Sequence, residues 1–477
     1  MGLTSPAQSR NTSRGPSRSH SRACSLHGAD TPEVPPPALP VESAIDRLRG
    51  ALERAKGAGL ARDVLLAKAE ALLRLKESQR QALQAMIAKA SGSFERARRL
   101  GDADALKQIK EQLANLRTDD PVQLREAEQV RRRVHNALED IKGHLRVFCR
   151  VRPLSDKERA MRDEVVVRMA DGMRIELPRN GVFTFDGVFG PGSQEEVFEE
   201  CKDLVQSAVD GHNVTIFAYG QTGAGKTYTL YGTPEQEGIA GRAITEVFKL
   251  VDGLRGSKGI VSASMFELYR NRLVDLLRKE RRGKSPPCSP KLNLRNCEGG
   301  MQVDNLCEEE AKDPKELKRL LYRGLAARAT AANAINSESS RSHLLFTIKV
   351  TTMDVATQEL VSGKLVLCDL GGSERLKKSE ATGEQLKEAI EINRSLTALG
   401  DVIEAVAERK RQVPYRNHKL TQLLQDSLGG TAKTLMFVNC SPARVNLHET
   451  AMSLNYALRA KRIVNAAGPR GGVWASR

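Results

Sequence analysis

The chain has 477 residues, of which 75 are basic and 59 acidic, giving a formal net charge of +16. Its length exceeds that of one ordinary domain, and its basic balance favours an anionic partner such as nucleic acid, an acidic membrane surface or an acidic protein surface. The eight cysteines form no CxxC pair, and no run approaches the ~18 apolar residues that span a bilayer. These features exclude a disulfide scaffold, a zinc ribbon and a membrane span, and they indicate an intracellular protein with reduced thiols.

Residues 1–40 are rich in Ser, Pro and Arg, and no acidic residue precedes Asp30. A segment with so few apolar residues cannot bury enough surface to fold, so we predict a disordered basic tail. The tail is either a solvated leader or a tether to a polyanionic surface, and its composition favours neither.

Apolar residues recur at helical spacing through residues 41–118, which predicts a helical arm. Glycines interrupt this pattern at Gly57, Gly59, Gly92 and Gly101. Because an interior glycine costs ~1 kcal/mol relative to alanine, we expect turns at these points and a helical hairpin rather than one long coiled coil.

A separate helix, the neck helix, is predicted over residues 122–144, after a fresh start at Pro121. Its apolar stripe alternates spacings of three and four residues and consists of Ala127, Val130, Val134, Ala137 and Ile141. The stripe is shorter than the three or four heptads that identify a coiled coil, so it could seat a second copy in a homodimer or pack on the next domain. Gly143 can adopt a positive φ and is expected to end the helix.

Strand-like and helix-like runs then alternate over residues 145–465, and residues 466–477 are expected to be a flexible C-terminus. This alternation predicts a layered α/β fold with helices packed on a central, buried mixed sheet. A basic, proline-rich insertion from Arg278 to Lys291 is predicted to be a mobile loop.

The apolar run VTIFAY leads directly into the glycine-rich loop GQTGAGKT, which ends at Thr227. In such a loop, glycines let backbone N–H groups surround phosphates, while the lysine neutralises phosphate oxygens and the threonine holds Mg²⁺. Strand-forming residues before the loop supply the context that the motif requires, which favours it over an ordinary strand-to-helix turn. The sequence therefore predicts a nucleoside triphosphate site built on Lys226 and Thr227.

Two further motifs carry groups suited to phosphate chemistry. The apolar strand in KLVLCDLGGSE delivers Asp369 at its carboxyl end, where open α/β sheets bind ligands, and its carboxylate suits Mg²⁺ and a bound water. Gly372 could offer its backbone N–H to a γ-phosphate because it has no side chain to block the approach. The segment NSESSRSH, from Asn336 to His343, combines hydroxyls, an arginine and amides, as a phosphate-sensing loop requires.

Taken together, these motifs resemble the kinesin motor domain. The resemblance runs from about Leu145 to Ile463 and includes, in the family's order, RVFCRVRP, FAYGQTGAGKT, NxxSSRSH, DLGGSE, INRSL, PYRNHKLTQLLQDSLGG and SLNYALRA. It implies a three-layer kinesin-type P-loop NTPase motor domain that uses ATP and Mg²⁺, preceded here by the tail, the arm and the neck helix. A GTPase is disfavoured because no guanine-reading NKxD motif follows these segments.

The family's site residues map onto matching positions of this chain. The resemblance implies contacts with ATP for Arg150, Arg152, Pro153, Gln221, Thr222, Gly223, Ala224, Gly225, Lys226, Thr227, Tyr228 and Asn336. Contacts with Mg²⁺ are implied for Thr227, Ser340 and Asp369. Roles in hydrolysis are implied for Ser339, Ser340, Arg341, Gly372, Glu374 and Asn393. In such motors the arginine here numbered Arg341 pairs with Glu374 when the γ-phosphate closes the site, and Asn393 supports that closed state.

A helix predicted from Gly383 to Arg409 corresponds to the relay helix of kinesins and has an apolar face that can dock on the sheet. Basic residues on both sides of it resemble the surface that meets acidic tubulin, namely Lys377, Lys378, Arg409, Lys410, Arg411, Arg416 and Lys419. A solvated basic face is the alternative interpretation. The resemblance therefore favours microtubules over nucleic acid as the anionic partner, and the cytoplasmic microtubule cytoskeleton as the location.

The neck junction VRRRVHNALEDIKGHLRVFCRVRP resembles that of the kinesin-14 family. Motors of that family lie at the C-terminus and walk toward microtubule minus ends, and the motor-like region here reaches its final helix near Ile463. Minus-end-directed movement is therefore expected. Four positions depart from the family's usual residues: Gly371 replaces Ala, Asn333 replaces Thr, His418 replaces Ser and His144 replaces Asn.

The sequence thus predicts a microtubule-stimulated ATP hydrolase that changes its grip on a microtubule and swings its neck. The alternative is a structural microtubule-binding protein whose nucleotide site no longer turns over. The presence of Lys226, Thr227, Arg341, Asp369 and Glu374 favours the motor.

Overall fold

The computed structural model describes residues 44–474 apart from 58–63, 117, 119, 255–256, 279–290, 298–299, 336–338, 356, 375–383 and 464–472. The predicted disordered tail lies outside the described residues, as does nearly all of the predicted loop from Arg278 to Lys291. Of the helices that are described, none combines the length and the apolar character needed to cross a membrane.

Four helices precede the α/β region: α1 (Ala44–Gly57), α2 (Val64–Leu100), α3 (Ala103–Ala114) and α4 (Pro121–Lys142). The predicted turns at Gly57 and Gly101 coincide with helix ends, and Gly59 lies outside the described residues. The predicted turn at Gly92 is wrong, because α2 continues through it. Phe94, two residues further on, is fully buried, so packing of the helix face offsets the glycine's poor helix propensity.

Helix α4 is the predicted neck helix. It begins at Pro121, where the Asp120 side chain accepts a hydrogen bond of 2.9 Å from the Val122 backbone N–H, and it ends at Gly143, whose φ is 93°. Four of the five residues of its apolar stripe are buried in one cluster with α2 and α3, whereas Ile141 is exposed. The stripe therefore packs on the arm, which neither of the two sequence-based alternatives proposed.

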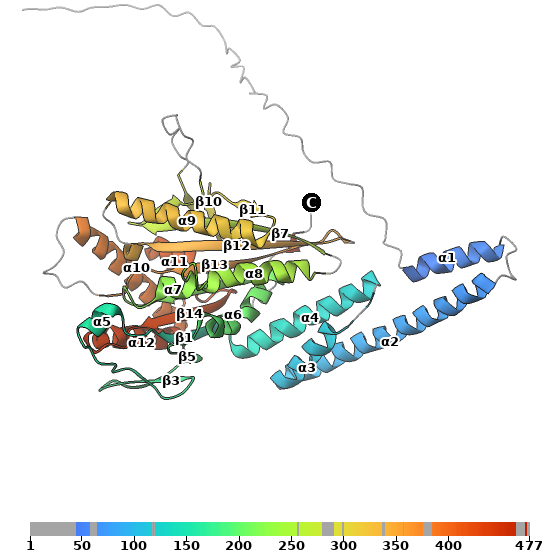
Figure 1. Ribbon diagram of the computed structural model, residues 1–477, viewed down its shortest axis with the longest axis horizontal. Helices are drawn as coiled ribbons and strands as arrows, with labels where there is room; N and C mark the ends of the chain where they lie inside the picture. The colour runs from blue at the N-terminus through green and yellow to red at the C-terminus, as the bar shows by residue number, and fades with distance from the viewer. Residues whose placement is uncertain are drawn as a thin grey trace, which may run out of the picture. The chain divides into compact units, whose positions relative to one another are not determined.

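The α/β region is built on a 10-stranded mixed sheet with the order β11-β7-β12-β13-β6-β14-β1-β5, while β8 pairs with β7 and β15 with β13 (Figure 1). Its strands are β1 (Leu145–Val151), β5 (Gly187–Phe189), β6 (Asn213–Tyr219), β7 (Ser257–Tyr269), β8 (Arg272–Asp275), β11 (Glu309–Ala311), β12 (His343–Asp354), β13 (Leu360–Asp369), β14 (Lys433–Cys440) and β15 (Val473–Trp474). The central strands β13, β6, β14, β1 and β5 are parallel neighbours, whereas β7, β11, β12 and β13 pair antiparallel.

Two small sheets, eight further α-helices and three short 3-10 helices complete the described region. The small sheets consist of β2 (Arg168–Met169), β3 (Arg174–Leu177) and β4 (Gly181–Thr184), and of β9 (Asn293–Cys297) and β10 (Gly300–Asp304). The helices are α5 (Asp156–Ala160), α6 (Gln194–Val209), α7 (Lys226–Leu230), α8 (Ile239–Asp252), α9 (Pro314–Ile335), α10 (Glu384–Ala407), α11 (Lys419–Leu423) and α12 (Leu447–Ala460). Strand β15 shows that two residues of the segment predicted as a flexible C-terminus pair with β13.

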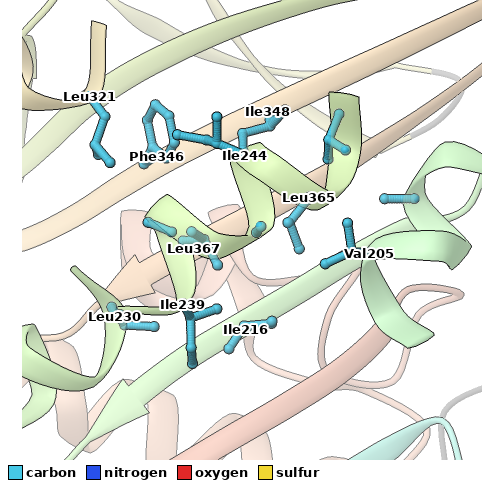
Figure 2. Packing of buried hydrophobic residues seen from close by; sticks show 14 of the residues in the cluster. Val205, Ile216, Leu230, Ile239, Ile244, Leu321, Phe346, Ile348, Leu365 and Leu367 are labelled. Atoms are coloured by element: carbon cyan, nitrogen blue, oxygen red, sulfur yellow. The ribbon is translucent and has the colours of Figure 1, made fainter. Parts of the chain in front are cut away.

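The sheet has a hydrophobic core on each face, which confirms the predicted three-layer α/β fold. One core packs α6, α8 and α9 on the sheet, and Figure 2 shows Ile244 of α8 close to Phe346 of β12. The other packs α10, α11 and α12 on the opposite face. Strand β6 alternates between them, since Ile216 belongs to the first core and Phe217 to the second.

Helix α10 is the predicted relay helix. Its residues Leu399 and Ile403 are fully buried against the sheet, as the apolar pattern predicts, but Ile390 of the same predicted face is 56% exposed. Within the described side chains of the predicted apolar face, Leu399 and Ile403 therefore dock on the sheet and Ile390 does not.

Candidate active site

The glycine-rich loop connects β6 to α7 in the strand-loop-helix arrangement that its motif requires. Gly220 has φ 147°, and a Cβ atom there would lie 2.3 Å from the Asn439 carbonyl oxygen on the neighbouring strand β14. Gly225 precedes α7 with φ 99°. These positions accept glycine alone without strain, and the loop therefore has the backbone that a phosphate cradle needs.

Lys226 is 7% exposed and turns its ammonium group back onto its own loop. Its Nζ donates hydrogen bonds of 2.8 Å to the Gly220 carbonyl and 3.0 Å to the Gln221 carbonyl. Burial lowers the pKa of Lys226, and the nearby carboxylates of Asp369 and Glu374 oppose that shift. The lysine is thus a cation held inside the loop, where phosphate oxygens could replace the two carbonyls as its partners.

Thr227 and Asp369 lie together at the metal position implied by the sequence. The Thr227 hydroxyl donates a hydrogen bond of 2.7 Å to Asp369 Oδ2, and Arg328 Nη1 lies 3.6 Å from the same oxygen. Asp369 is 2% exposed, and its Oδ1 atom has no hydrogen-bond partner among the described residues. Buried carboxylate and hydroxyl oxygens with an unused acceptor fit Mg²⁺, which prefers a few oxygen ligands beside phosphate oxygens.

The residues after β13 contact the phosphate loop directly. Glu374 accepts hydrogen bonds of 2.7 Å from the Thr222 N–H and 2.5 Å from its hydroxyl, and the Ser373 N–H donates to the Gly220 carbonyl at 3.1 Å. A Cβ atom at Gly372 would lie 2.3 Å from Thr222 Oγ1, so a side chain there would displace the Thr222 hydroxyl. The Gly372 N–H itself donates to the Ser340 carbonyl at 2.8 Å.

Arg341 and Glu374, which the kinesin resemblance pairs in the closed site, have different partners in this structure. Arg341 Nη1 donates a hydrogen bond of 2.8 Å to Glu388 on α10. Burial disfavours the charge on Glu388, but hydrogen bonds from Tyr269 and Arg341 outweigh it and lower the pKa of Glu388. Arg341 and Glu374 are therefore not paired with each other in this structure, and each is held by a separate polar contact.

A cavity of about 490 Å³ opens beside the phosphate loop and is large enough for a base and ribose. Its lining includes Arg150, Arg152, Pro153 and Tyr228, for which the kinesin resemblance implies contacts with ATP. The Arg150 guanidinium lies 5.3 Å from the centre of the Tyr228 ring. Arg152 Nε donates a hydrogen bond of 2.7 Å to the Gly223 carbonyl, which joins this cavity to the phosphate loop.

Some predicted site residues are not brought to the loop by the described contacts. Asn336 lies outside the described residues, and so do Lys377 and Lys378 of the predicted track-binding surface. Ser339 and Ser340 form a short 3-10 turn with Arg341 just before β12. Asn393 lies on α10, two residues before the buried Ser395.

Sequence reasoning gave no role to His343 and Ser395, although both stand inside quoted motifs. The His343 ring lies 2.7 Å from the Ser395 hydroxyl through Nε2, and its Nδ1 accepts a hydrogen bond of 3.0 Å from the Gly371 N–H. Burial lowers the pKa of His343 to about 3, so this imidazole stays neutral. The ring thereby connects the start of β12, the segment after β13 and α10. The position of His343 within the SSRSH motif was the sequence signal that could have identified it.

The described part of the predicted track-binding surface follows α10. Arg409, Lys410, Arg411 and Arg416 lie between α10 and α11, beside a cavity of about 1080 Å³ lined in part by Lys410, Tyr415 and Arg416. His418, where kinesins usually have Ser, caps α11: its Nδ1 accepts a hydrogen bond of 3.0 Å from the Leu420 N–H. Its Nε2 lies 3.3 Å from Glu391 on α10, a contact that a serine is too short to make.

Comparison with known proteins gives consistent matches. The kinesin motor domain family matches residues 150–463. The chain is 46% identical over 372 residues to the kinesin-like protein KIN-14I of Oryza sativa subsp. japonica and 45% identical over 373 residues to KIN-14E of Arabidopsis thaliana, with 76% of this chain covered in each case. These alignments span only 29% of each relative's length.

A solved structure described as that of a fast kinesin is also similar. It shares 37% sequence identity with this chain and superimposes with a TM-score of 0.64 over 69% of this chain and 94% of the solved one. The similarity covers the α/β region that holds the phosphate loop, the residues after β13 and α10.

Proposed function

Because the chain belongs to the kinesin-14 family, we propose that it is a microtubule-stimulated motor that hydrolyses Mg-ATP and moves toward microtubule minus ends. Its place of action is the cytoplasmic microtubule cytoskeleton. The rival function is structural binding to microtubules without turnover.

The arrangement of Thr227, Asp369 and Glu374 carries this proposal. The metal position and the phosphate loop are both tied to the end of one strand, β13, so a change of ligand on the loop changes the contacts of the residues that follow β13. A protein that used its nucleotide only as a structural filler would not need this coupling. The coupling supports turnover rather than passive binding.

The chain's own residues have separate tasks in the proposed reaction. Arg150 and Tyr228 would frame the base, and the loop N–H groups with Lys226 would hold the phosphates. Bound Mg²⁺, held by Thr227 and Asp369, would neutralise charge that develops on the phosphate oxygens. Glu374 and Arg341 would have to leave Thr222 and Glu388 before they could pair and position the attacking water.

Helix α10 provides a route from the nucleotide to the track. Glu388 near its beginning holds Arg341, and Glu391 one turn later contacts His418, which caps α11 within the basic segment. Release of Arg341 from Glu388 would therefore remove a contact of α10. The same helix contacts α11 through Glu391 and His418. This route supports a nucleotide-dependent grip on acidic tubulin.

Steady-state ATP hydrolysis by the full chain, measured with and without microtubules, tests the proposal. We expect slow basal hydrolysis and a clear increase on addition of microtubules. Co-sedimentation with microtubules in the absence of any hydrolysis above background would instead support the structural binder. Gliding of polarity-marked microtubules over surface-bound protein then measures the direction.

A further inference from the structure

The apolar stripe of the neck helix already has a partner within the same chain. Ala127, Val130 and Val134 are at most 6% exposed and share one hydrophobic cluster with residues of α2 and α3. The arm contributes Ile87, Ala90, Phe94, Ala97, Leu106, Ile109 and Leu113 to this cluster. The surface that a second neck helix would need is therefore covered by the arm (Figure 1).

Helix ends encoded in the sequence make this arrangement a bundle of separate helices. Gly101 has φ 65° and is followed by Asp102, whose side chain accepts a hydrogen bond of 2.9 Å from the Ala105 N–H and so caps α3. Asp120 and Pro121 end the next connection and start α4. Since these caps interrupt any continuous coiled coil between α2 and α4, the chain is built to fold back on itself.

Polar contacts fix the register of α2 and α4. Gln123 Nε2 donates to the Arg80 carbonyl at 2.6 Å near the start of α4, and Arg133 pairs with Glu95 further along both helices. The Arg133 guanidinium also lies 4.9 Å from the centre of the buried Phe94 ring. Positions 80 and 95 of α2 thus face positions 123 and 133 of α4, so these two helices are parallel and α3 returns between them.

Helix α3 also contacts the motor domain. Lys110 Nζ lies 3.1 Å from Asp203 Oδ1 on α6 and 3.2 Å from Nδ1 of the neck residue His135. With Nδ1 accepting from Lys110, the ring proton is on Nε2, which lies 3.0 Å from the Ser207 hydroxyl of α6. One lysine of the arm therefore bridges the neck helix and the motor domain.

We propose that α2 and α3 of the arm and the neck helix α4 form one rigid three-helix lever, in which α2 and α3 occupy the neck surface that a second copy would otherwise use and Lys110 latches the lever to α6. The packing of α2 and α3 on the neck stripe does not depend on the proposed function, whereas the action as a lever rests on the proposed motor function. Because Arg80 of α2 faces the start of α4, residues 64–79 of α2 continue past the neck helix and lengthen the lever by about 24 Å at 1.5 Å per residue.

The occupancy of the stripe is tested on the full chain by sedimentation and by amide exchange of α4. We expect the parent to sediment as a monomer with a protected α4. Leu106→Asp places a charge in the arm side of the cluster and leaves the neck stripe intact, so it should either double the sedimenting mass or remove the protection of α4. Leu75→Asp, at an exposed leucine of α2, is the matched control and should behave as the parent.

Two results would overturn the occupancy. One is a parent chain that sediments as a dimer and whose α4 loses protection on dilution to monomer. The other is a Leu106→Asp chain that remains a monomer with α4 protected as in the parent. Unchanged nucleotide binding by Leu106→Asp confirms that its motor domain is folded.

The latch is tested by Lys110→Met, which keeps an unbranched side chain and removes the charge. Gliding should slow relative to the parent while basal ATP hydrolysis stays the same, because the described contacts of Lys110 are with Asp203 and His135, outside the nucleotide site. Lys107→Met, three residues earlier, is the control, because the described ion pair of Lys107 is with Asp104 of the same helix. Equal gliding speeds of Lys110→Met and the parent would refute the latch, whereas absence of any gliding by the parent would refute the motor function and leave the sedimentation result standing.

Discussion

Arg341 donates a 2.8 Å hydrogen bond to the buried carboxylate of Glu388, and this contact keeps the switch arginine on α10 and away from Glu374. Closure of the site as proposed requires that this bond break. Glu388 therefore competes with Glu374 for the same guanidinium.

Glu388→Gln should raise the basal rate of ATP hydrolysis. The amide keeps the size of the side chain but replaces a charge-assisted hydrogen bond by a neutral one, a loss of about 1 kcal/mol that corresponds to roughly fivefold in the closing equilibrium. Hydrolysis without microtubules measures the effect. Glu404→Gln, at a half-exposed carboxylate of the same helix, is the control, and a basal rate for Glu388→Gln at or below that of the control would contradict the competition.

Lys226→Ala and Glu374→Ala should separate binding from hydrolysis. Among the described residues, Lys226 is the only one whose ammonium group is hydrogen-bonded to carbonyls of the phosphate loop. Its loss should therefore abolish ATP binding. Glu374→Ala should still bind ATP but lower kcat by about two to three orders of magnitude, because the positioning pair with Arg341 cannot form. Titration with a fluorescent ATP analogue and steady-state hydrolysis provide the two readouts.

Glu176→Ala, an exposed carboxylate of β3, serves as the control for these substitutions. A Glu374→Ala chain that turned over at the parent's rate would show that this glutamate does not position the reaction.

The sequence predicted those features that depend on local pattern. The loop from Gly220 to Thr227, the alternation of the strands and the end of the neck helix at Gly143 each follow from residue types at fixed spacings. The partner of the neck stripe could not be predicted, because periodicity identifies an apolar face and says nothing of what covers it. The partner of Arg341 could not be predicted from the resemblance, which describes the closed site and not the contact with Glu388. Gly92 fits inside α2 because the burial of Phe94 outweighs the poor helix propensity of glycine.

Binding to microtubules should fall steeply with salt. Tubulin presents an acidic surface, and attraction between exposed charges weakens as the Debye length shortens from ~10 Å at 0.1 M salt to ~3 Å at 1 M. Deletion of residues 1–40, or replacement of the basic residues between Arg278 and Lys291, should lower affinity in co-sedimentation and leave basal hydrolysis unchanged. Replacement of the exposed Arg168 and Arg174 by Gln is the control, and affinity unchanged by both alterations would remove the tail and the loop from the interface.

The contact of the neck helix with the motor domain should weaken in acid. Burial and the charge of Lys110 hold the pKa of His135 well below its ordinary value near 6.5, so the ring is neutral in the folded protein. The unfolded chain binds the proton as the pH falls below about 6.5, and stability that is complete above this pH is lost below it. At pH 5 the loss reaches up to about 2 kcal/mol.

His135→Gln should flatten this dependence, since an amide donates and accepts without titrating. Urea unfolding of the full chain at pH 7 and at pH 5, followed by helical circular dichroism, compares the two chains. His448→Gln, at an exposed histidine, should keep the parent's dependence. Equal loss of stability in His135→Gln and the parent would assign the acid sensitivity to other groups, such as Asp203, whose pKa is lowered mainly by the hydrogen bond from Lys142 against the effect of burial.

We expect the direction of movement to depend on the junction at Gly143 and His144. The His144 carbonyl accepts a hydrogen bond of 2.7 Å from the Thr434 N–H at the start of β14, so the backbone joins the neck to the sheet. The imidazole turns back toward the neck, where Nε2 lies 3.6 Å from Asp140, and its buried Nδ1 atom has no hydrogen-bond partner in the described part of the chain. The His144 side chain therefore makes fewer hydrogen bonds at this junction than an asparagine amide could make, because an amide donates and accepts at once.

We predict minus-end-directed gliding by the parent chain, and gliding by His144→Asn that is at least as fast. An amide can donate to one partner and accept from another across the junction, whereas the described contact of the imidazole is with Asp140 on the neck. Polarity-marked microtubules measure direction and speed together, with His448→Gln as the control for general effects of losing a histidine. Slower gliding by His144→Asn than by the parent would show that the imidazole supports the junction better than an amide does. Plus-end-directed gliding by the parent would show that the neck, although joined to β14 by the same backbone hydrogen bond, swings in the opposite sense to that expected of the family.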